Sequence, residues 1–178
     1  MLQLTGVVHS KNKPVLYVMI GPAGSGKSTA SKNLFQNCIR VCPDSVRKEL
    51  FGDEADQREP GKVFHIAYTR MEDALCNGFD VVFDATNTTT MARKKVLDRV
   101  DAIQHTTVAV YMNTPLEECK RRNQQRGRIV PDSVIDRQYA QMMRDASSIP
   151  EQFDEIMIVE GWKNQRLDCL ANRSAFWK

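Results

Sequence analysis

Short apolar runs alternate with longer amphipathic stretches over most of the chain. The first run, Val15–Ile20, contains no charged residue, as expected of a strand that is buried on both faces of a sheet. Other short apolar runs predict four more strands, at 39–42, 79–83, 106–112 and 154–160. Amphipathic stretches between the strands predict helices at 28–37, 44–50, 62–77, 89–103, 116–125 and 132–145.

This alternation of strands and helices predicts crossover connections, and therefore a mainly parallel five-stranded sheet with helices on both faces. The fold class that follows is α/β with three layers. Ligands of such sheets bind beyond the carboxyl ends of the strands. We therefore expect the functional residues directly after the predicted strands.

Composition and charge exclude only some classes of protein. A chain of 178 residues is expected to form a single domain, 1–178. The polar sequence of the tail, 161–178, does not point to any function. Its 25 Lys and Arg against 22 Asp and Glu give a net charge of +3, which allows a nucleic-acid partner if the charge is clustered. No run of about 18 apolar residues occurs, so no membrane span is expected. The N-terminus does not resemble a signal peptide, which predicts a cytoplasmic protein.

A phosphate-binding motif follows the first predicted strand. Residues 21–28, GPAGSGKS, match the pattern G-x-x-x-x-G-K-[ST] and open a predicted helix. Its glycines let backbone N–H groups turn inward around an anion, and the helix N-terminus adds positive charge. Lys27 is expected to reach the β- and γ-phosphates of ATP, and the Ser28 hydroxyl to bind Mg²⁺. The residues predicted to bind the nucleotide here are Gly21, Ala23, Gly24, Ser25, Gly26, Lys27, Ser28 and Thr29.

The motif places the fold in the P-loop NTPase type. Asp84 ends the third predicted strand, where a carboxylate holds Mg²⁺ directly or through water, or anchors a nearby cation. The next residue is Ala85, which argues against a motor-type NTPase with a second carboxylate that polarises water. Asp84, Thr86 and Asn87 are predicted to contact the substrate. Asn87 and Thr88 also suit the cap of the following helix.

A second aspartate, Asp44, follows the second predicted strand and is expected to face the phosphate site. A kinase needs a carboxylate that accepts the proton of the acceptor hydroxyl, so Asp44 is the predicted general base. Arg47 lies one helical turn further along the same face, where an arginine suits a phosphate that flanks the hydroxyl. The alternative is structural, with Asp44 as a helix N-cap and Arg47 as a solvated charge.

A basic stretch at residues 120–128, KRRNQQRGR, carries five positive charges and no acidic residue. Small P-loop kinases close an arginine-bearing lid over the triphosphate, where it balances charge and keeps water out. A small helical lid is therefore predicted at about 122–131, with Arg126 as the first candidate for its catalytic arginine and Arg122 as the second. The stretch also suits a nucleic-acid backbone, but without interleaved aromatic residues it does not indicate base stacking.

Taken together, these motifs resemble the kinase domain of the phage and bacterial polynucleotide 5′-kinases over residues 15–145. The motifs that carry the resemblance are GPAGSGKS, Asp44-x-x-Arg47, Asp84-x-Thr86-Asn87 and Arg122-Asn123-x-x-Arg126-Gly127. The resemblance implies transfer of the γ-phosphate of ATP, with Mg²⁺, to the 5′-hydroxyl end of DNA or RNA. It also implies a location in the host cytoplasm if the chain is phage-encoded.

The resemblance implies a role for each matching residue. Asp44 would be the general base, and Arg47 would hold the phosphate on the 3′ side of the acceptor nucleotide. Asp84 would brace the site from the third strand, and Arg126 would be the lid arginine on the β- and γ-phosphates.

Two alternatives to this function stay open. Related P-loop kinases phosphorylate other hydroxyls, so the acceptor of the second hypothesis is a nucleoside, a sugar or a hydroxymethylated base in phage DNA. The third hypothesis is a non-kinase NTP-binding switch, which binds ATP and transfers no phosphate.

Overall fold

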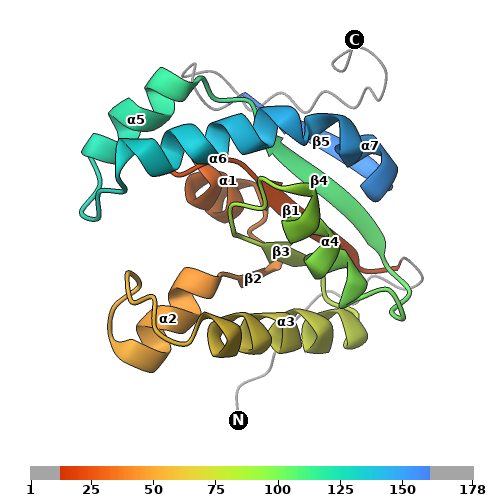
Figure 1. The fold of residues 1–178 in the computed structure, drawn as a ribbon. Coiled ribbons are helices and arrows are strands. Elements are labelled where there is room, and N and C mark those ends of the chain that lie inside the picture. Colours follow the sequence, from red (N-terminus) through yellow and green to blue (C-terminus); the bar gives the residue numbers. More distant parts are fainter. Residues whose placement is uncertain (1–12, 161–178) are drawn as a thin grey trace.

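The predicted sheet is present in the computed structural model, which describes residues 13–160. All four strand pairings are parallel, and the strands lie in the order β2-β3-β1-β4-β5 (Figure 1). The strands are β1 (Val15–Ile20), β2 (Ile39–Val41), β3 (Val81–Phe83), β4 (Thr106–Met112) and β5 (Glu155–Val159). The tail 161–178 lies outside the described residues, as do residues 1–12.

Helices connect the strands as the sequence predicts, so the α/β fold class is confirmed. The helices are α1 (Lys27–Leu34), α2 (Pro43–Phe51), α3 (Pro60–Cys76), α4 (Thr90–Asp98), α5 (Leu116–Gln124), α6 (Asp132–Arg144) and α7 (Ile149–Gln152). Within residues 13–160, none of them combines the length and the apolar character needed to cross a membrane.

The alternation of side chains along each strand divides the core between the two faces of the sheet. On β1, Leu16, Val18 and Ile20 belong to the cluster formed with α3, α4 and α6. Met19 of the same strand belongs to the cluster on the other face, with α1. Because all four side chains are fully buried, β1 is the central strand that its uninterrupted apolar run predicts.

One predicted strand is too long because a helix end uses its first residues. β3 begins at Val81 and not at Phe79, since the Phe79 N–H donates to the Ala74 carbonyl at the end of α3, at 3.0 Å. Gly78, with a φ of 79°, makes the turn that allows this contact. Phe79 is left half exposed, at the amino edge of the sheet.

Two helices end several residues earlier than predicted, and the first is α1, which ends at Leu34 and not at residue 37. α4 ends at Asp98 and not at Ile103, because the chain continues in tight turns in which the Ile103 N–H binds the Val100 carbonyl, at 2.8 Å. Between α6 and β5, the sequence analysis missed a short 3₁₀ helix, Ala146–Ser148, and the single turn of α7 that follows it. Both are too short to show a helical period in the sequence.

One fully buried arginine, Arg93 of α4, ties the last helices to the segment that follows β3. Its guanidinium donates, within 3.3 Å, to the carbonyls of Asn87, Thr88 and Asp145 and to the side chains of Thr90, Ser148 and Gln152. A buried cation is tolerated only when its donors are satisfied in this way. The segment after β3 is therefore fixed in position before any ligand binds.

We expect Arg93→Met to lower the free energy of unfolding by about 3 kcal/mol or more, because it leaves several buried carbonyls without a donor. Urea denaturation measures this loss. The control is Lys94→Ala on the next residue, whose exposed ion pair with Asp98 is worth about 0.5 kcal/mol or less. Equal losses in the two variants would show that the Arg93 contacts contribute little.

Candidate active site

The phosphate loop joins β1 to α1 and packs directly against α5. Gly24 has a φ of 79°, and Gly26 has a φ of 94°, both in the region that glycine adopts without strain. A β-carbon at Gly24 would lie 2.1 Å from the backbone carbonyl oxygen of Cys119 in α5. Only glycine fits here, because the atom in the way is backbone and cannot move aside cheaply.

Hydrogen bonds from three other elements hold the loop. The Gly21 N–H donates to the Thr86 carbonyl after β3, at 2.9 Å. The Thr114 hydroxyl donates to the Ser25 carbonyl at 2.9 Å, and the Ala23 N–H donates to Gln138 Oε1 of α6, also at 2.9 Å. The loop is thus preformed, as an anion-binding loop must be if its N–H groups are to converge on phosphates.

Lys27, the first residue of α1, is buried and turns back over the loop. Its ammonium donates to the carbonyls of Gly21, at 2.8 Å, and Pro22, at 2.7 Å. Burial lowers the pKa of this ammonium to about 8, with a smaller contribution from the positive charge of Arg126 and against the opposing effect of Asp84. Bound phosphates would raise the pKa again, so Lys27 suits the role predicted for it.

Asp84 ends β3 and is almost fully buried. Its Oδ2 accepts from Arg40 of β2, at 2.5 Å and 3.0 Å, and from the Ser31 hydroxyl of α1, at 3.2 Å. Of the two roles predicted for this carboxylate, the anchoring of a cation is the one seen here, and the cation is Arg40. Arg40 is not among the predicted site residues, although an arginine inside a short strand is unusual and indicates a buried partner.

Asp44 and Arg47 come from the start of α2, directly beyond β2, and form an ion pair. The Asp44 carboxylate is half exposed, whereas the Arg47 guanidinium is buried. Arg47 Nε is one of two buried side-chain nitrogen or oxygen atoms without a hydrogen-bond partner within residues 13–160. A buried unpaired donor is costly, and a phosphate oxygen is an acceptor of the kind it lacks.

The predicted lid consists of the end of α5 and the loop to α6. Asn123 is fully buried, and its amide closes the loop: Nδ2 donates to the Val130 carbonyl at 2.7 Å, and Oδ1 accepts from the Val130 N–H at 3.0 Å. We call this pair of bonds the Asn123 clasp. It explains the asparagine in the Arg122-Asn123-x-x-Arg126-Gly127 motif, to which the sequence analysis assigned no role.

Three arginines of the lid occupy different positions. Arg122 binds Glu118 at 2.6 Å, and its Nη1 lies next to the phosphate loop, 3.1 Å from where a β-carbon at Gly26 would be. Arg126 is exposed and lines the same cavity as the loop. Arg128 donates to the Glu54 carbonyl in the α2–α3 loop, at 2.9 Å. The lid therefore reaches across to the side of the molecule that carries α2 and α3 (Figure 1).

A cavity of about 1130 Å³ lies between these elements. Twelve of the predicted site residues line it: Ala23, Gly24, Gly26, Lys27, Ser28, Thr29, Asp44, Arg47, Asp84, Thr86, Arg122 and Arg126. Gly21 and Ser25 belong to the loop but are buried and do not line the cavity. The structure thus brings the nucleotide-binding motif, both aspartates and the lid into one space.

Among the residues predicted to contact the substrate, Asn87 alone does not line the cavity. Its side chain is buried, does not line the cavity and donates to the Met19 carbonyl of β1, at 2.8 Å. The helix-capping role proposed for Asn87 and Thr88 is wrong. Thr89 caps α4, because its side chain accepts the Ala92 N–H at 3.1 Å.

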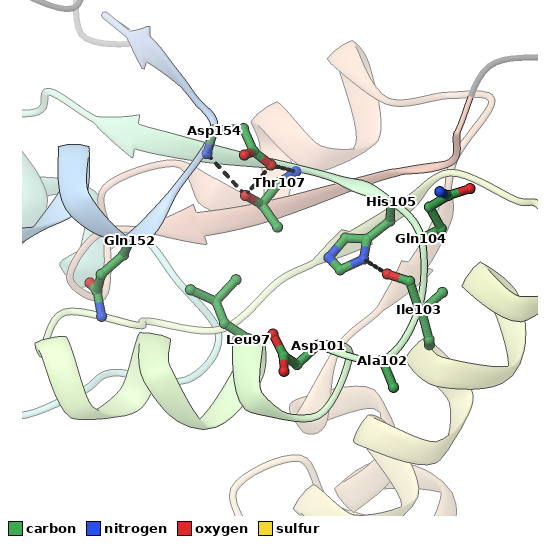
Figure 2. A pocket seen from close by; sticks show the side chains of 9 residues that line it. All are labelled: Leu97, Asp101, Ala102, Ile103, Gln104, His105, Thr107, Gln152 and Asp154. Atoms are coloured by element: carbon green, nitrogen blue, oxygen red, sulfur yellow. Dashed lines mark hydrogen bonds between the residues drawn. The ribbon is translucent and has the colours of Figure 1, made fainter.

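A second hollow, of about 550 Å³, lies at the opposite, amino-terminal edge of the sheet (Figure 2). Its polar groups largely bind one another: Asp154 accepts from the N–H and hydroxyl of Thr107, and His105 Nδ1 contacts the Ile103 carbonyl at 2.6 Å. It contains none of the predicted site residues. The cavity at the carboxyl edge is therefore the candidate active site.

Comparison with known proteins identifies the family. The AAA_33 family, described as an AAA domain, matches residues 16–146, a span that includes the phosphate loop, both aspartates and the lid. The chain belongs to the AAA_33 family. It is a P-loop kinase domain of this type, and the fold predicted from its motifs is confirmed.

Individual relatives of this AAA_33 domain differ in the acceptors that their names indicate. L-seryl-tRNA(Sec) kinase of Methanococcus maripaludis is 26% identical over 134 residues, 70% of this chain and 51% of that protein, so the chain spans about half the length of this curated relative. A chain of the Pnkp1/Rnl/Hen1 RNA repair complex has a TM-score of 0.71 at 23% identity, over 80% of this chain and 48% of that one. A gluconokinase from Sinorhizobium meliloti 1021 has a TM-score of 0.54 at 15% identity, over 86% of each chain. At these identities the two structural similarities show the fold alone.

We expect ATP binding by this AAA_33 domain to take up protons at about pH 9, because Lys27 with a pKa of about 8 is mostly neutral there and the phosphates restore its charge. Titration calorimetry in two buffers of different ionisation enthalpy measures the uptake. The control is Lys27→Arg, which keeps its charge at this pH and takes up none. Equal heats in both buffers for the unaltered chain would contradict the lowered pKa.

Proposed function

We propose that the chain transfers the γ-phosphate of ATP to the 5′-hydroxyl end of a nucleic acid. The observation that carries the proposal is the Asp44–Arg47 pair, which lines the same cavity as the phosphate loop. It sets a half-exposed carboxylate beside a buried guanidinium whose Nε has no partner. This combination suits a hydroxyl that is flanked by a phosphate, as at the 5′ end of a polynucleotide.

The charge of the cavity supports an acceptor of this kind. Its charged lining residues are five cations and two carboxylates: Lys27, Arg47, Arg122, Arg126 and Arg128 against Asp44 and Asp84. In this proposal ATP binds to Lys27, Arg122 and Arg126. Arg47 and Arg128 are left on the acceptor side, where they favour a phosphodiester over an uncharged sugar.

Each residue then has a chemical task. The Asp44 carboxylate accepts the proton of the acceptor hydroxyl, while the hydroxyl oxygen bonds to the γ-phosphorus and the bond to the β–γ bridging oxygen breaks, which releases ADP. Lys27 and Arg126 bind the phosphate oxygens on which charge develops. Arg47 holds the neighbouring phosphate, so that the hydroxyl stays in line with the bond that breaks.

The site also fits Mg²⁺, which prefers hard oxygen donors. The Ser28 hydroxyl is exposed in the cavity, and Asp84 uses only Oδ2 for its contacts with Arg40 and Ser31. Ser28 would bind the ion directly and Asp84 through water. When bound, Mg²⁺ neutralises charge on the β- and γ-phosphate oxygens.

The direct test is incubation with γ-labelled ATP and 5′-hydroxyl oligonucleotides of DNA and RNA, single-stranded and with duplex ends. We expect the label at 5′ ends only. Free nucleosides, gluconate and other small hydroxyl compounds serve as comparators, since the names of the relatives include kinases for acceptors other than polynucleotides. Label on a small compound and on no oligonucleotide would establish the alternative acceptor class.

We expect Asp44→Asn to lower turnover by about 10²-fold or more and to leave ATP affinity nearly unchanged, as the loss of a general base does. Steady-state kinetics and a separate nucleotide-binding titration measure the two effects. Asp98→Asn is the matched control, because Asp98 is also a half-exposed aspartate in an ion pair. Unaltered turnover in Asp44→Asn would remove Asp44 from the mechanism.

For Arg126→Ala we expect turnover to fall by about 10³-fold, since the arginine stabilises the charge of the transition state. Arg121→Ala, which truncates an exposed arginine of α5 directly before the lid, is the control and is expected to keep full activity. A loss confined to the KM of the acceptor would instead place Arg126 in acceptor binding.

A further inference from the structure

Two large apolar side chains line the acceptor side of the cavity, beyond the charged pair. Phe64 comes from α3, and Ile129 comes from the lid loop between α5 and α6. Ile129 is 57% exposed and follows Arg128 in the lid loop. Proton transfer to Asp44 and phosphate binding by Arg47 require neither side chain. The proposed chemistry therefore gives Phe64 and Ile129 no role.

Phe64 is connected to the reacting groups through Arg47. The guanidinium carbon of Arg47 lies 5.9 Å from the centre of the Phe64 ring, and the same guanidinium pairs with Asp44. The Tyr68 ring, 5.8 Å away, supports the Phe64 ring from the next turn of α3. Asp44, Arg47 and Phe64 thus form a continuous series along one wall of the cavity, in the order carboxylate, cation, aromatic ring.

Ile129 enters the cavity from a different element. The two ends of its loop are joined by the Asn123 clasp, and Arg128 holds the loop to the Glu54 carbonyl of the α2–α3 loop. These contacts bring the lid loop close to the α2–α3 loop (Figure 1). Phe64 and Ile129 line the same cavity from two elements, so a flat group bound there can contact an aromatic ring and an aliphatic side chain.

We propose that Phe64 and Ile129 form a base slot, which binds a nucleobase from the first two nucleotides of the acceptor. The inference rests on the proposed function. A nucleotide chain with its hydroxyl at Asp44 and its phosphate at Arg47 carries a planar base within reach of Phe64. Stacking on an aromatic side chain accepts every base, because each base has a π-face, and Arg47 adds a cation beside the ring. A sugar acid has no such face.

The experiment compares two acceptors of equal length, one with natural nucleotides and one with abasic residues at its first two positions. With the unaltered chain, we expect the abasic acceptor to show a KM raised about 10-fold or more, at a similar turnover. Phe64→Leu and Ile129→Ala are each expected to raise the KM of the natural acceptor about 10-fold and to change the KM of the abasic acceptor little. The KM of ATP should stay unchanged in both variants.

Two controls keep the slot separate from folding. Phe64→Leu retains an apolar side chain in the partly buried site, and Ile129→Ala truncates an exposed one, so thermal melting should show both variants folded. Met91→Ala, at a 61% exposed residue of α4 outside the cavity, should change neither KM. Acceptors with a single abasic position show which of the two bases occupies the slot.

Each other outcome has a distinct meaning. Equal effects of the variants on natural and abasic acceptors, or no effect on either, would overturn the base slot while oligonucleotide kinase activity remains. If the unaltered chain phosphorylates neither acceptor, the proposed function is wrong, and the base slot is rejected with it.

Discussion

The site depends above all on the close approach of the phosphate loop to the backbone of α5. At Gly24 the two are so near that a β-carbon would lie 2.1 Å from the Cys119 carbonyl oxygen. Because α5 carries Arg122 and continues into the loop with Arg126, this contact fixes the base of the lid against the loop that binds phosphate. A kinase needs such a fixed relation, since its arginines must meet the triphosphate without a large rearrangement of the backbone.

Around this contact, the carboxyl ends of three strands lead into different parts of the site. β1 leads into the phosphate loop, β2 delivers Asp44 and Arg47, and β3 delivers Asp84. Arg40 forms an ion pair with the buried Asp84 carboxylate. The pair holds the carboxylate in place and balances its negative charge. The cavity therefore has one side formed by the glycine-rich phosphate loop with Lys27, and another side to which α2 and α3 contribute Asp44, Arg47 and Phe64.

The sequence predicts the strands and most of the site, because both follow from local patterns. The run at Val15–Ile20 and the motif after it each lie within a few residues. Contacts between distant segments cannot be predicted from local patterns. Arg93 binds groups up to 59 residues away. In the sequence, Asn123 is one polar residue of an amphipathic helix among others, and only the structure shows its bonds to Val130. The same holds for Asn87, whose hydrogen bond to the Met19 carbonyl joins β1 to the segment after β3, two parts of the chain that are 68 residues apart.

The Asn123 clasp has a consequence for how such a domain diversifies. Because one buried amide joins both ends of the lid loop, the points at which the loop leaves α5 and approaches α6 are held together whatever residues it encloses. Because Arg126 also lies inside this loop, only exchanges at other enclosed positions, such as Ile129, leave the cations around the phosphate loop unchanged. A single hydrogen-bonded asparagine thereby fixes a loop that brings both a cation and an apolar side chain to the cavity.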